Sequence, residues 1–194
     1  MIRYATSEDC KEIANLHKNH ITEGFLSALG VRFLSTLYST IVTAESAFCI
    51  VCEENNHIVG FVSGCVDLKK LYKEFIRRNL LSATTILLPK IIKPKNIKRI
   101  FETLLYPSRE SHKYAAAEIL SIAVREDYQG KGVSHVLFEK LKEEFRNRGV
   151  NKFKVVVGSQ IVRAQKFYEK MGGKLINEIY IHEGEKSYVY EWEI

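Results

Sequence analysis

The feature that most constrains the fold is an apolar run that ends in a glycine-containing turn and continues as an amphipathic segment. Residues 117–125 form an apolar stretch whose length is typical of a buried strand. A turn follows at 126–131, and residues 132–148 then space apolar side chains as a helix does. The inward-facing residues of that helix are Val133, Val136, Leu137, Leu141 and Phe145. Gly149 stands where helices commonly end, so the sequence predicts strand, turn and helix in direct succession.

The predicted turn suits a phosphate group. The first N–H groups of a helix have no partner inside the helix and carry partial positive charge, so they bind phosphates readily. Gly130 and Gly132 have no side chain to keep a diphosphate from the backbone, and Lys131 adds a positive charge. The spacing matches neither the Walker A loop nor the Rossmann fingerprint. A plain strand–turn–helix, with glycines serving only the turn, is the alternative.

The rest of the chain alternates between strand and helix patterns. Thr6 and Asp9 resemble a helix-starting cap, and a second helix is expected to begin near Gly30. Gly60 and Gly64 lie inside a predicted strand and indicate a bulge or a close backbone approach. The other predicted strands are 2–4, 47–54, 57–66, 152–157, 174–181 and 187–194, and a further helix is predicted at 161–171. This alternation indicates a mixed α/β sheet with helices on both faces.

Two segments resemble motifs of the GNAT superfamily of N-acetyltransferases. Residues 129–134 read Gln-Gly-Lys-Gly-Val-Ser, similar to the family signature Q/R-x-x-G-x-G/A, with Ser134 in the last position. Residues 161–173 are similar to the second motif, N-x-x-A-x-x-F/L-Y-x-x-x-G-F, with Ile161 in place of asparagine and Gly173 in place of the aromatic residue. The resemblance covers residues 117–175 and implies the GNAT acyl-CoA acyltransferase fold, with a mixed, mostly antiparallel central sheet.

The resemblance also implies a cofactor site. Acetyl-CoA would be the cosubstrate, with no metal, and a primary amine would attack its thioester directly. The pantetheine arm would lie along the backbone of Ile122, Ala123 and Val124, and the N–H of Ile122 would polarise the thioester carbonyl. The pyrophosphate would bind the backbone of Gln129, Gly130, Lys131, Gly132, Val133 and Ser134.

Two side chains are candidates for the proton transfers. Tyr168 matches the tyrosine that the family uses as general acid, and Glu118 on the predicted strand is our candidate base, directly or through water. The alternatives are an aromatic packing role for Tyr168 and a solvated carboxylate for Glu118. His20 and Glu23 are weaker candidates for the lining of an acceptor pocket.

The net charge of +6 is concentrated in one segment. Residues 67–113 hold twelve Lys/Arg against four Asp/Glu, and they contain all three prolines. Apolar residues at helical spacing around 71–76 and 97–105 predict a basic helical insertion within a single domain spanning 1–194. Three interpretations are open: a lid over the acceptor site, contact with an anionic membrane surface or a lipid-linked acceptor, and attraction of an anionic acceptor such as a nucleotide-linked amino sugar.

Other classes of protein fit less well. The first residues lack the apolar segment of a signal peptide, and no apolar run is long enough to span a bilayer, so we expect a cytoplasmic protein. Cys49 and Cys52 have CxxC spacing, but three positions along a strand separate opposite faces, so no metal site is expected. Aromatic residues are sparse among the lysines, which disfavours nucleic acid binding.

We therefore expect an N-acetyltransferase that acts on a small-molecule amine, such as an amino sugar. The alternatives are a non-catalytic acyl-CoA-binding or regulatory module, and an interaction domain that uses the basic segment.

Overall fold

The computed structural model describes residues 1–22, 25–91, 114–182 and 184–194. Within these ranges, seven strands form one sheet in the order β1-β2-β3-β4-β5-β7-β6. The strands are β1 (Ile2–Tyr4), β2 (Ala47–Glu54), β3 (His57–Cys65), β4 (Ala117–Val124), β5 (Lys152–Gly158), β6 (Lys174–His182) and β7 (Glu185–Glu193). The central pair, β4 and β5, is parallel, and the other neighbouring pairs are antiparallel.

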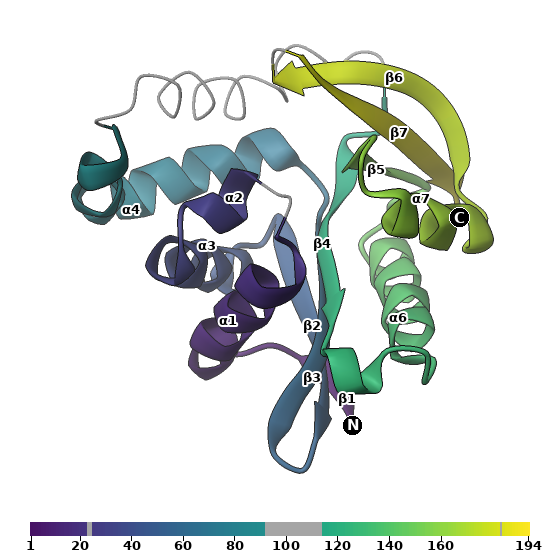
Figure 1. Ribbon diagram of the computed structural model, residues 1–194, viewed down its shortest axis with the longest axis horizontal. Coiled ribbons are helices and arrows are strands. Elements are labelled where there is room, and N and C mark those ends of the chain that lie inside the picture. The colour runs from purple at the N-terminus through teal and green to yellow at the C-terminus, as the bar shows by residue number, and fades with distance from the viewer. Residues whose placement is uncertain (23–24, 92–113, 183) are drawn as a thin grey trace.

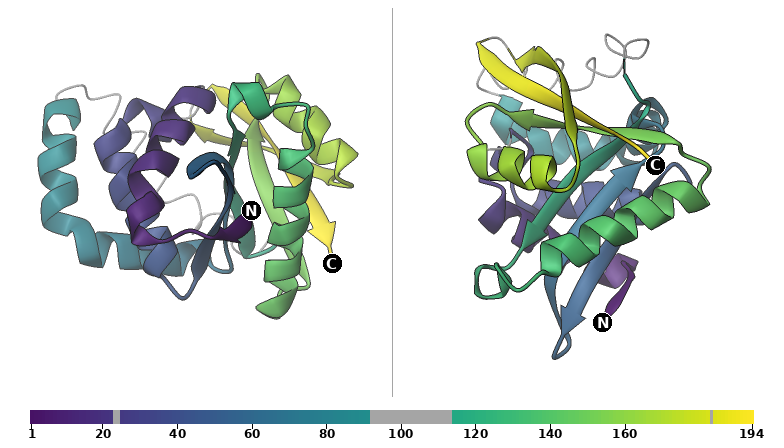
Figure 2. Two further views of the ribbon diagram at one scale, coloured as in Figure 1. Left: turned by 90° about the horizontal axis from the view of Figure 1, so that it is seen from below. Right: turned by 90° about the vertical axis from the view of Figure 1, so that its right-hand side faces the viewer.

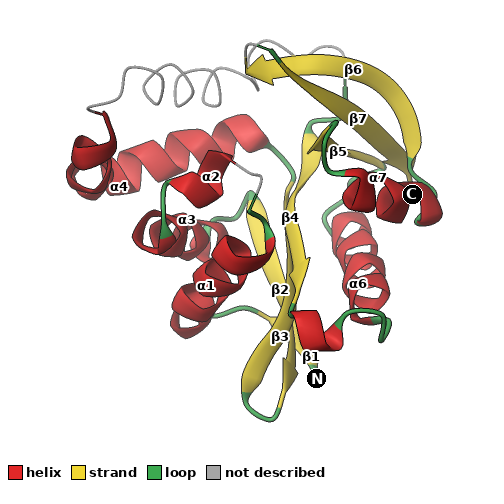
Figure 3. Ribbon diagram, in the orientation of Figure 1, coloured by secondary structure: helices red, strands yellow, loops and turns green. Residues whose placement is uncertain are grey.

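Helices cover both faces of the sheet (Figures 1 and 3). One face carries η1 (Ser7–Asp9), α1 (Cys10–His20), α2 (Phe25–Ala28), α3 (Val31–Thr43) and α4 (Leu68–Ile91). The other carries α6 (Val133–Asn147) and α7 (Val162–Lys170), with η2 (Glu126–Tyr128) joining β4 to α6. Figure 2, left, shows the sheet between these two layers. The expected mixed, mostly antiparallel α/β fold is confirmed.

Each face of the sheet has its own hydrophobic cluster. Tyr38 and Phe61 are fully buried between the sheet and the layer of α1 and α3. Phe138, Phe145 and Trp192 belong to the cluster beneath α6 and α7. Along β4, and likewise along β5, successive side chains point to opposite faces of the sheet, so each strand has side chains facing both clusters.

Gly64 in β3 brings α6 close to the sheet. A Cβ atom at this position would lie 2.8 Å from the Phe48 ring and 2.9 Å from the Phe145 ring, so a larger residue would push α6 away. The ladder between β3 and β4 also shifts here, because Ser63 faces Ser121 whereas Gly64 faces Ile119. Leu120 is therefore an extra residue in β4. Gly64 thus marks the close approach that the sequence offered, whereas the extra residue of the bulge belongs to the neighbouring strand and not to the strand that holds the glycines.

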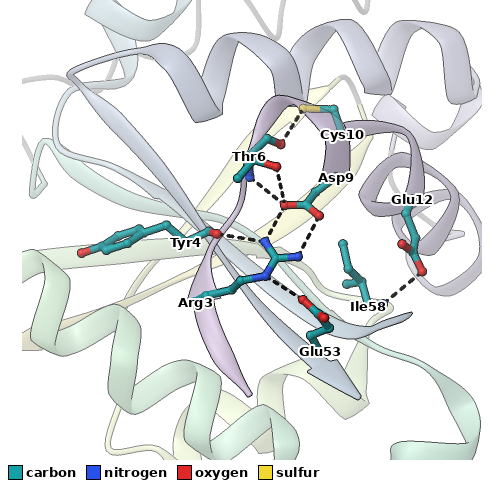
Figure 4. A network of polar contacts seen from close by, with 8 residues as sticks. All are labelled: Arg3, Tyr4, Thr6, Asp9, Cys10, Glu12, Glu53 and Ile58. Atoms are coloured by element: carbon teal, nitrogen blue, oxygen red, sulfur yellow. Dashed lines mark hydrogen bonds and ion pairs between the residues drawn. The ribbon is translucent and has the colours of Figure 1, made fainter. Parts of the chain in front are cut away.

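The predicted cap of the first helix is part of a larger polar network (Figure 4). The carboxylate of Asp9 accepts hydrogen bonds from the backbone N–H of Thr6 at 2.7 Å and from Nη1 of Arg3 at 2.7 Å. The same guanidinium donates through Nε to Glu53 of β2 at 2.6 Å. The network therefore links β1 both to η1, where the helical layer begins, and to the neighbouring strand β2.

The described part of the predicted insertion is helix α4. Leu68, Leu71 and Phe75 are buried in the cluster of α1 and α3, and the Phe75 ring meets Phe33 edge-on at 5.6 Å. Asn79 donates to the Thr40 hydroxyl at 3.0 Å. The first half of α4 is thus packed on α3, whereas the second predicted helical stretch, around 97–105, lies outside the described residues. In the described ranges, no helix combines the length and the apolar character needed to cross a membrane.

Candidate active site

Strands β4 and β5 separate after a short parallel contact. Their register pairs only Ala117 with Phe153 and Glu118 with Lys154, although both strands continue beyond these residues. The bulge at Leu120 lies just past this contact, where a bulge increases the local twist of a strand. The edge of β4 that faces away from β3 is therefore not covered by β5 over most of its length.

The ladder alternation identifies which backbone groups face this uncovered edge. The N–H of Arg125 donates to the carbonyl of Val59 at 2.8 Å, so residue 125 is a hydrogen-bonded partner of β3. Hydrogen-bonded and outward-facing residues alternate along an antiparallel ladder. Ala123 therefore directs its backbone to β3, and Ile122 and Val124 direct theirs to the uncovered edge.

The turn after β4 has the open backbone that a diphosphate needs. Gly130 and Gly132 have φ angles of +76° and +83°, and a Cβ atom added to either would meet no atom within 4 Å. Gly132 is the residue before α6, whose first backbone hydrogen bond runs from Val136 to the carbonyl of Gly132. The N–H groups of Val133 and Ser134 consequently have no partner within the helix.

Gln129 links the turn to its surroundings. Its Nε2 donates to the carbonyl of Val124 at 2.9 Å, which uses one of the outward groups of β4. Its Oε1 accepts from Nη2 of Arg163 at 2.9 Å, so the first turn of α7 is tied to the start of α6. Lys131 stacks on the Tyr128 ring with its Nζ 4.8 Å from the centroid. Lys131 and Arg163 give the turn two cations, of which the sequence analysis identified only the first.

Tyr168 lies on α7 and is buried. Its ring packs against Phe167, Trp192 and Tyr190, with centroid distances of 5.4, 5.8 and 6.4 Å. No described residue forms a hydrogen bond with its hydroxyl, and burial raises the pKa of Tyr168 above its usual range. The group therefore keeps its proton at neutral pH, as a general acid must.

Glu118 lies at the contact between β4 and β5, paired with a residue that the sequence analysis missed. Its Oε2 is 2.9 Å from Nζ of Lys154, and the two side chains are 9% and 8% exposed. Burial raises the pKa of Glu118, and the ammonium of Lys154 opposes that shift. Glu118 is thus one member of a buried ion pair. It is not the solvated carboxylate that the sequence analysis left as the alternative.

The sequence analysis also singled out His20, Glu23 and the pair Cys49 and Cys52. His20 is partly buried at the end of α1, and Glu23 lies outside the described residues. Cys49 is buried and Cys52 is partly exposed, both as free thiols. Within the described ranges, no three His, Cys, Asp or Glu side chains come together as a metal site would require.

Two surface hollows lie near β1, an edge strand of the sheet, and not at the turn after β4. One, of about 320 Å³, is lined by residues of β1 and α6, including Tyr4 and Glu144. The other, of about 240 Å³, is lined by residues around the start of β2, including Phe48 and Arg148. Neither includes a residue of β4, β5 or α7, so the separation of β4 and β5 remains the candidate site.

Comparisons with known proteins agree with this reading of the fold. A model of the Acetyltransferase (GNAT) family matches residues 18–173. No protein with curated annotation matches the sequence at a significant level. Three solved structures share the fold at low sequence identity, and each alignment covers 100% of this chain.

The first is a ribosomal-protein-alanine N-acetyltransferase from Brucella melitensis, with a TM-score of 0.64, 12% identity and 99% of that chain covered. The second is the ribosomal-protein-S18-alanine N-acetyltransferase from Escherichia coli, with a TM-score of 0.61, 16% identity and 93% coverage. The third is the PaiA N-acetyltransferase from Thermoplasma acidophilum in complex with coenzyme A, with a TM-score of 0.62, 12% identity and 98% coverage.

Proposed function

The chain belongs to the GNAT acetyltransferase family, and on that premise we propose that it transfers the acetyl group of acetyl-CoA to a primary amine. The observation that carries the proposal is the uncovered edge of β4 leading into the glycine turn. An extended pantetheine arm can pair with that edge as another strand would, and the turn offers free N–H groups to the phosphates. The Thermoplasma neighbour, crystallised with coenzyme A, supports the same cofactor.

The residues present fit this cofactor at both ends. We assign the pyrophosphate to the backbone of residues 129–134, where the open space at Gly130 and Gly132 leaves room for it. We assign the pantetheine to the backbone of residues 122–124, with the outward groups of Ile122 and the N–H of Val124 as its partners, because Gln129 occupies the Val124 carbonyl. Lys131 and Arg163 add positive charge beside the turn. Bound acetyl-CoA would supply a thioester whose carbonyl the N–H of Ile122 can polarise.

The same geometry gives each proton transfer a candidate. Glu118 would accept the proton that an ammonium acceptor must lose before it can attack, directly or through water. Tyr168 would donate a proton to the leaving thiolate, since its hydroxyl stays protonated at neutral pH. These two residues come from β4 and from α7, the helix that follows β5 in the chain.

Helix α4 supports the lid interpretation of the basic segment. Tyr72, on this helix, is close enough to Glu118 that burial and the carboxylate charge together raise the pKa of the tyrosine. We propose that α4 forms one wall of the acceptor site, within a single domain spanning residues 1–194. An amino sugar is the first acceptor class to test. Alanine-starting peptides are the second, because the Brucella and E. coli neighbours are named for ribosomal-protein alanine.

The first test is calorimetric titration with acetyl-CoA and with free CoA. We expect Gly132→Glu to abolish binding, because the new carboxylate would occupy the place of the pyrophosphate. Gly149→Glu is the matched control: Gly149 ends the same helix, has a φ of +73° and also faces open space. A glutamate is less favourable at a helix C-terminus than at an N-terminus, so the control should lose at least as much stability.

Binding by wild type and Gly149→Glu, with loss in Gly132→Glu, supports the cofactor site. Thiol release would then be measured with amino sugars, polyamines, amino acids and alanine-starting peptides. Binding without thiol release from any amine favours the non-catalytic acyl-CoA-binding module. Absence of binding in folded wild-type protein contradicts the proposal.

A further inference from the structure

Lys154 is a buried cation to which the proposed reaction assigns no role. Its Nζ lies 2.9 Å from Oε2 of Glu118 and donates a 2.7 Å hydrogen bond to the carbonyl of Ala115. Phe153 and Val155 point into the cluster beneath α6 and α7, so Lys154 points to the opposite face, the one that α4 covers. Lys154 therefore lies on the same face of the sheet as the proposed acceptor site.

The pair sits at the point where β4 and β5 part. Glu118 and Lys154 face each other in the register, and they are the last paired residues before the strands separate. The ion pair is thus held by two backbones at once, and its place relative to the opening is fixed.

The two oxygens of Glu118 have different surroundings. Oε2 is fully buried, and its one contact with a described polar group is the 2.9 Å ion pair with Lys154, which is not aligned as a hydrogen bond. No described residue forms a hydrogen bond or an ion pair with Oε1. An acceptor nitrogen bound at Oε1 would therefore not have to displace the lysine from Oε2. The carboxylate has one oxygen for its permanent partner and one for a ligand.

The other groups around this pair cannot replace the lysine. Cys65 on β3 and Tyr72 on α4 face Glu118, and burial with the carboxylate charge keeps the thiol and phenol neutral. Asp67, before α4, is a second carboxylate whose charge reaches Cys65. Glu191 of β7 binds the backbone N–H of Ala115 at 3.2 Å and so adds negative charge. Among the described residues, Lys154 is the cation that faces Glu118.

We propose that Lys154 is a positioning residue for the base: it holds Oε2 of Glu118, keeps the carboxylate ionised, and leaves Oε1 for the ammonium of the acceptor. The proposal rests on the proposed function, in which Glu118 is the base. A proton then passes from the acceptor ammonium to Oε1, which leaves a neutral amine and a neutral carboxyl, and Lys154 keeps its own protons throughout. Without the lysine, a buried carboxyl would favour its neutral form, which cannot accept a proton.

The test compares charge-removing and charge-keeping variants. Lys154→Met removes the charge, Lys154→Arg keeps it, and Lys152→Met is the matched control on the same strand. Lys152 is exposed and pairs with Glu191 at 2.7 Å, and no ion pair joins it to Glu118. Acetyl-CoA titration verifies that each variant is folded. Where Lys154→Met does not fold, Lys154→Gln takes its place, because it keeps a hydrogen-bond donor while removing the charge.

The first readout is the pH dependence of thiol release with the best amine. In Lys154→Met or Lys154→Gln, we expect the acidic limb of the pH–rate profile to shift to higher pH by about one unit or more. Lys154→Arg and Lys152→Met should keep the limb of the wild type. A variant that binds acetyl-CoA normally and keeps the wild-type limb overturns the proposal, because a purely structural lysine would change stability and not this profile.

The second readout needs no acceptor. The Glu118 carboxyl is followed by carbon NMR in protein carrying labelled glutamate, with Glu118→Gln identifying its signal. Its titration should move upward when the charge at 154 is removed, and an unmoved titration overturns the proposal. Wild-type protein that binds acetyl-CoA but acetylates no amine contradicts the proposed function instead, so the two failures are distinguishable.

Discussion

The hydroxyl of Tyr38 lies 2.6 Å from Nδ1 of His17, and the two residues are 1% and 3% exposed. The Phe61 ring packs against both, with centroid distances of 5.3 Å to Tyr38 and 6.4 Å to His17. Burial raises the pKa of Tyr38 well above its usual range, and interactions with the hydroxyls of Ser121 and Ser63 oppose that shift. A buried polar chain thus runs from α1 to β4, next to the bulge at Leu120.

This chain predicts an acid-sensitive component of stability. Burial lowers the pKa of His17 to about 4, whereas an unfolded histidine titrates near 6.5. Between these values the unfolded chain binds the proton more readily, so the free energy of unfolding should fall as pH drops from about 6.5 to about 4. The full decrease in the free energy of unfolding is about 3 kcal/mol, and no such decrease is expected above pH 7.

Urea unfolding of wild type and His17→Gln at several pH values between 4 and 7.5 checks this expectation. His17→Gln should be less stable at pH 7 but should lose less stability on acidification than wild type. His135→Gln, at an exposed position on α6, should retain the wild-type dependence. An equal dependence in His17→Gln and wild type would show that His17 does not carry it.

A second prediction concerns the N-terminal network of Figure 4. The guanidinium of Arg3 and the N–H of Thr6 lower the pKa of Asp9 to about 2. This carboxylate stabilises the fold fully above about pH 4, and the contribution is lost as pH falls toward 2. Asp9→Asn should therefore cost about 2 kcal/mol at pH 7. Asp127→Asn removes an exposed ion pair with Arg125 and should leave the free energy of unfolding unchanged. Equal effects of the two substitutions would contradict this account.

Local signals in the sequence predicted most of the fold. Strand β2 has the predicted bounds, and β4 and α6 differ from prediction by one residue at one or both ends. Gly149 ends α6 in the left-handed conformation, with Val150 N–H bonded to the Phe145 carbonyl. Each of these features depends on neighbouring residues alone, so periodicity, turn residues and caps are sufficient to predict it.

The parts of the candidate site that sequence reasoning missed depend on distant pairings. Lys154 alternates with apolar residues in β5, a pattern typical of a strand with a solvated face. It is buried because β4 and β7 flank β5 and bring Glu118 to it. Arg163 likewise has no local signal, since its partner Gln129 is 34 residues earlier in the chain. The register that creates both contacts is set by the whole sheet.

A third prediction concerns Gly173, which stands where the second family motif has an aromatic residue. A Cβ atom here would lie 2.5 Å from Cζ2 of Trp192 and 2.9 Å from the carbonyl of Tyr168. The indole cannot move easily, because it stacks on Phe153 at 5.0 Å and donates to the Met171 carbonyl at 2.9 Å. Gly173→Ala should therefore cost about 2 kcal/mol in urea unfolding.

A double-mutant cycle tests whether the indole causes this cost. Trp192→Phe removes the atom nearest to the new Cβ, so Gly173→Ala should be less destabilising in that background. Gly172→Ala is the control: its φ is +84° and its surroundings are open, so its cost is backbone strain that Trp192→Phe cannot relieve. Equal coupling for both glycines would contradict the steric explanation.

A fourth prediction separates chemistry from packing at Tyr168. Tyr168→Phe keeps the ring and its contacts with Phe167 and Trp192, so stability and acetyl-CoA affinity should remain close to wild type. It removes the hydroxyl that we propose as general acid, so turnover should fall about 100-fold. The measurement is thiol release with any amine that the wild type accepts. Tyr190→Phe is the matched control, because the Tyr190 hydroxyl donates to Glu169 at 3.0 Å and has no role in the proposed reaction. Equal turnover in Tyr168→Phe and wild type would make Tyr168 an aromatic packing residue, and the proton of the leaving thiol would then have to come from another group or from water.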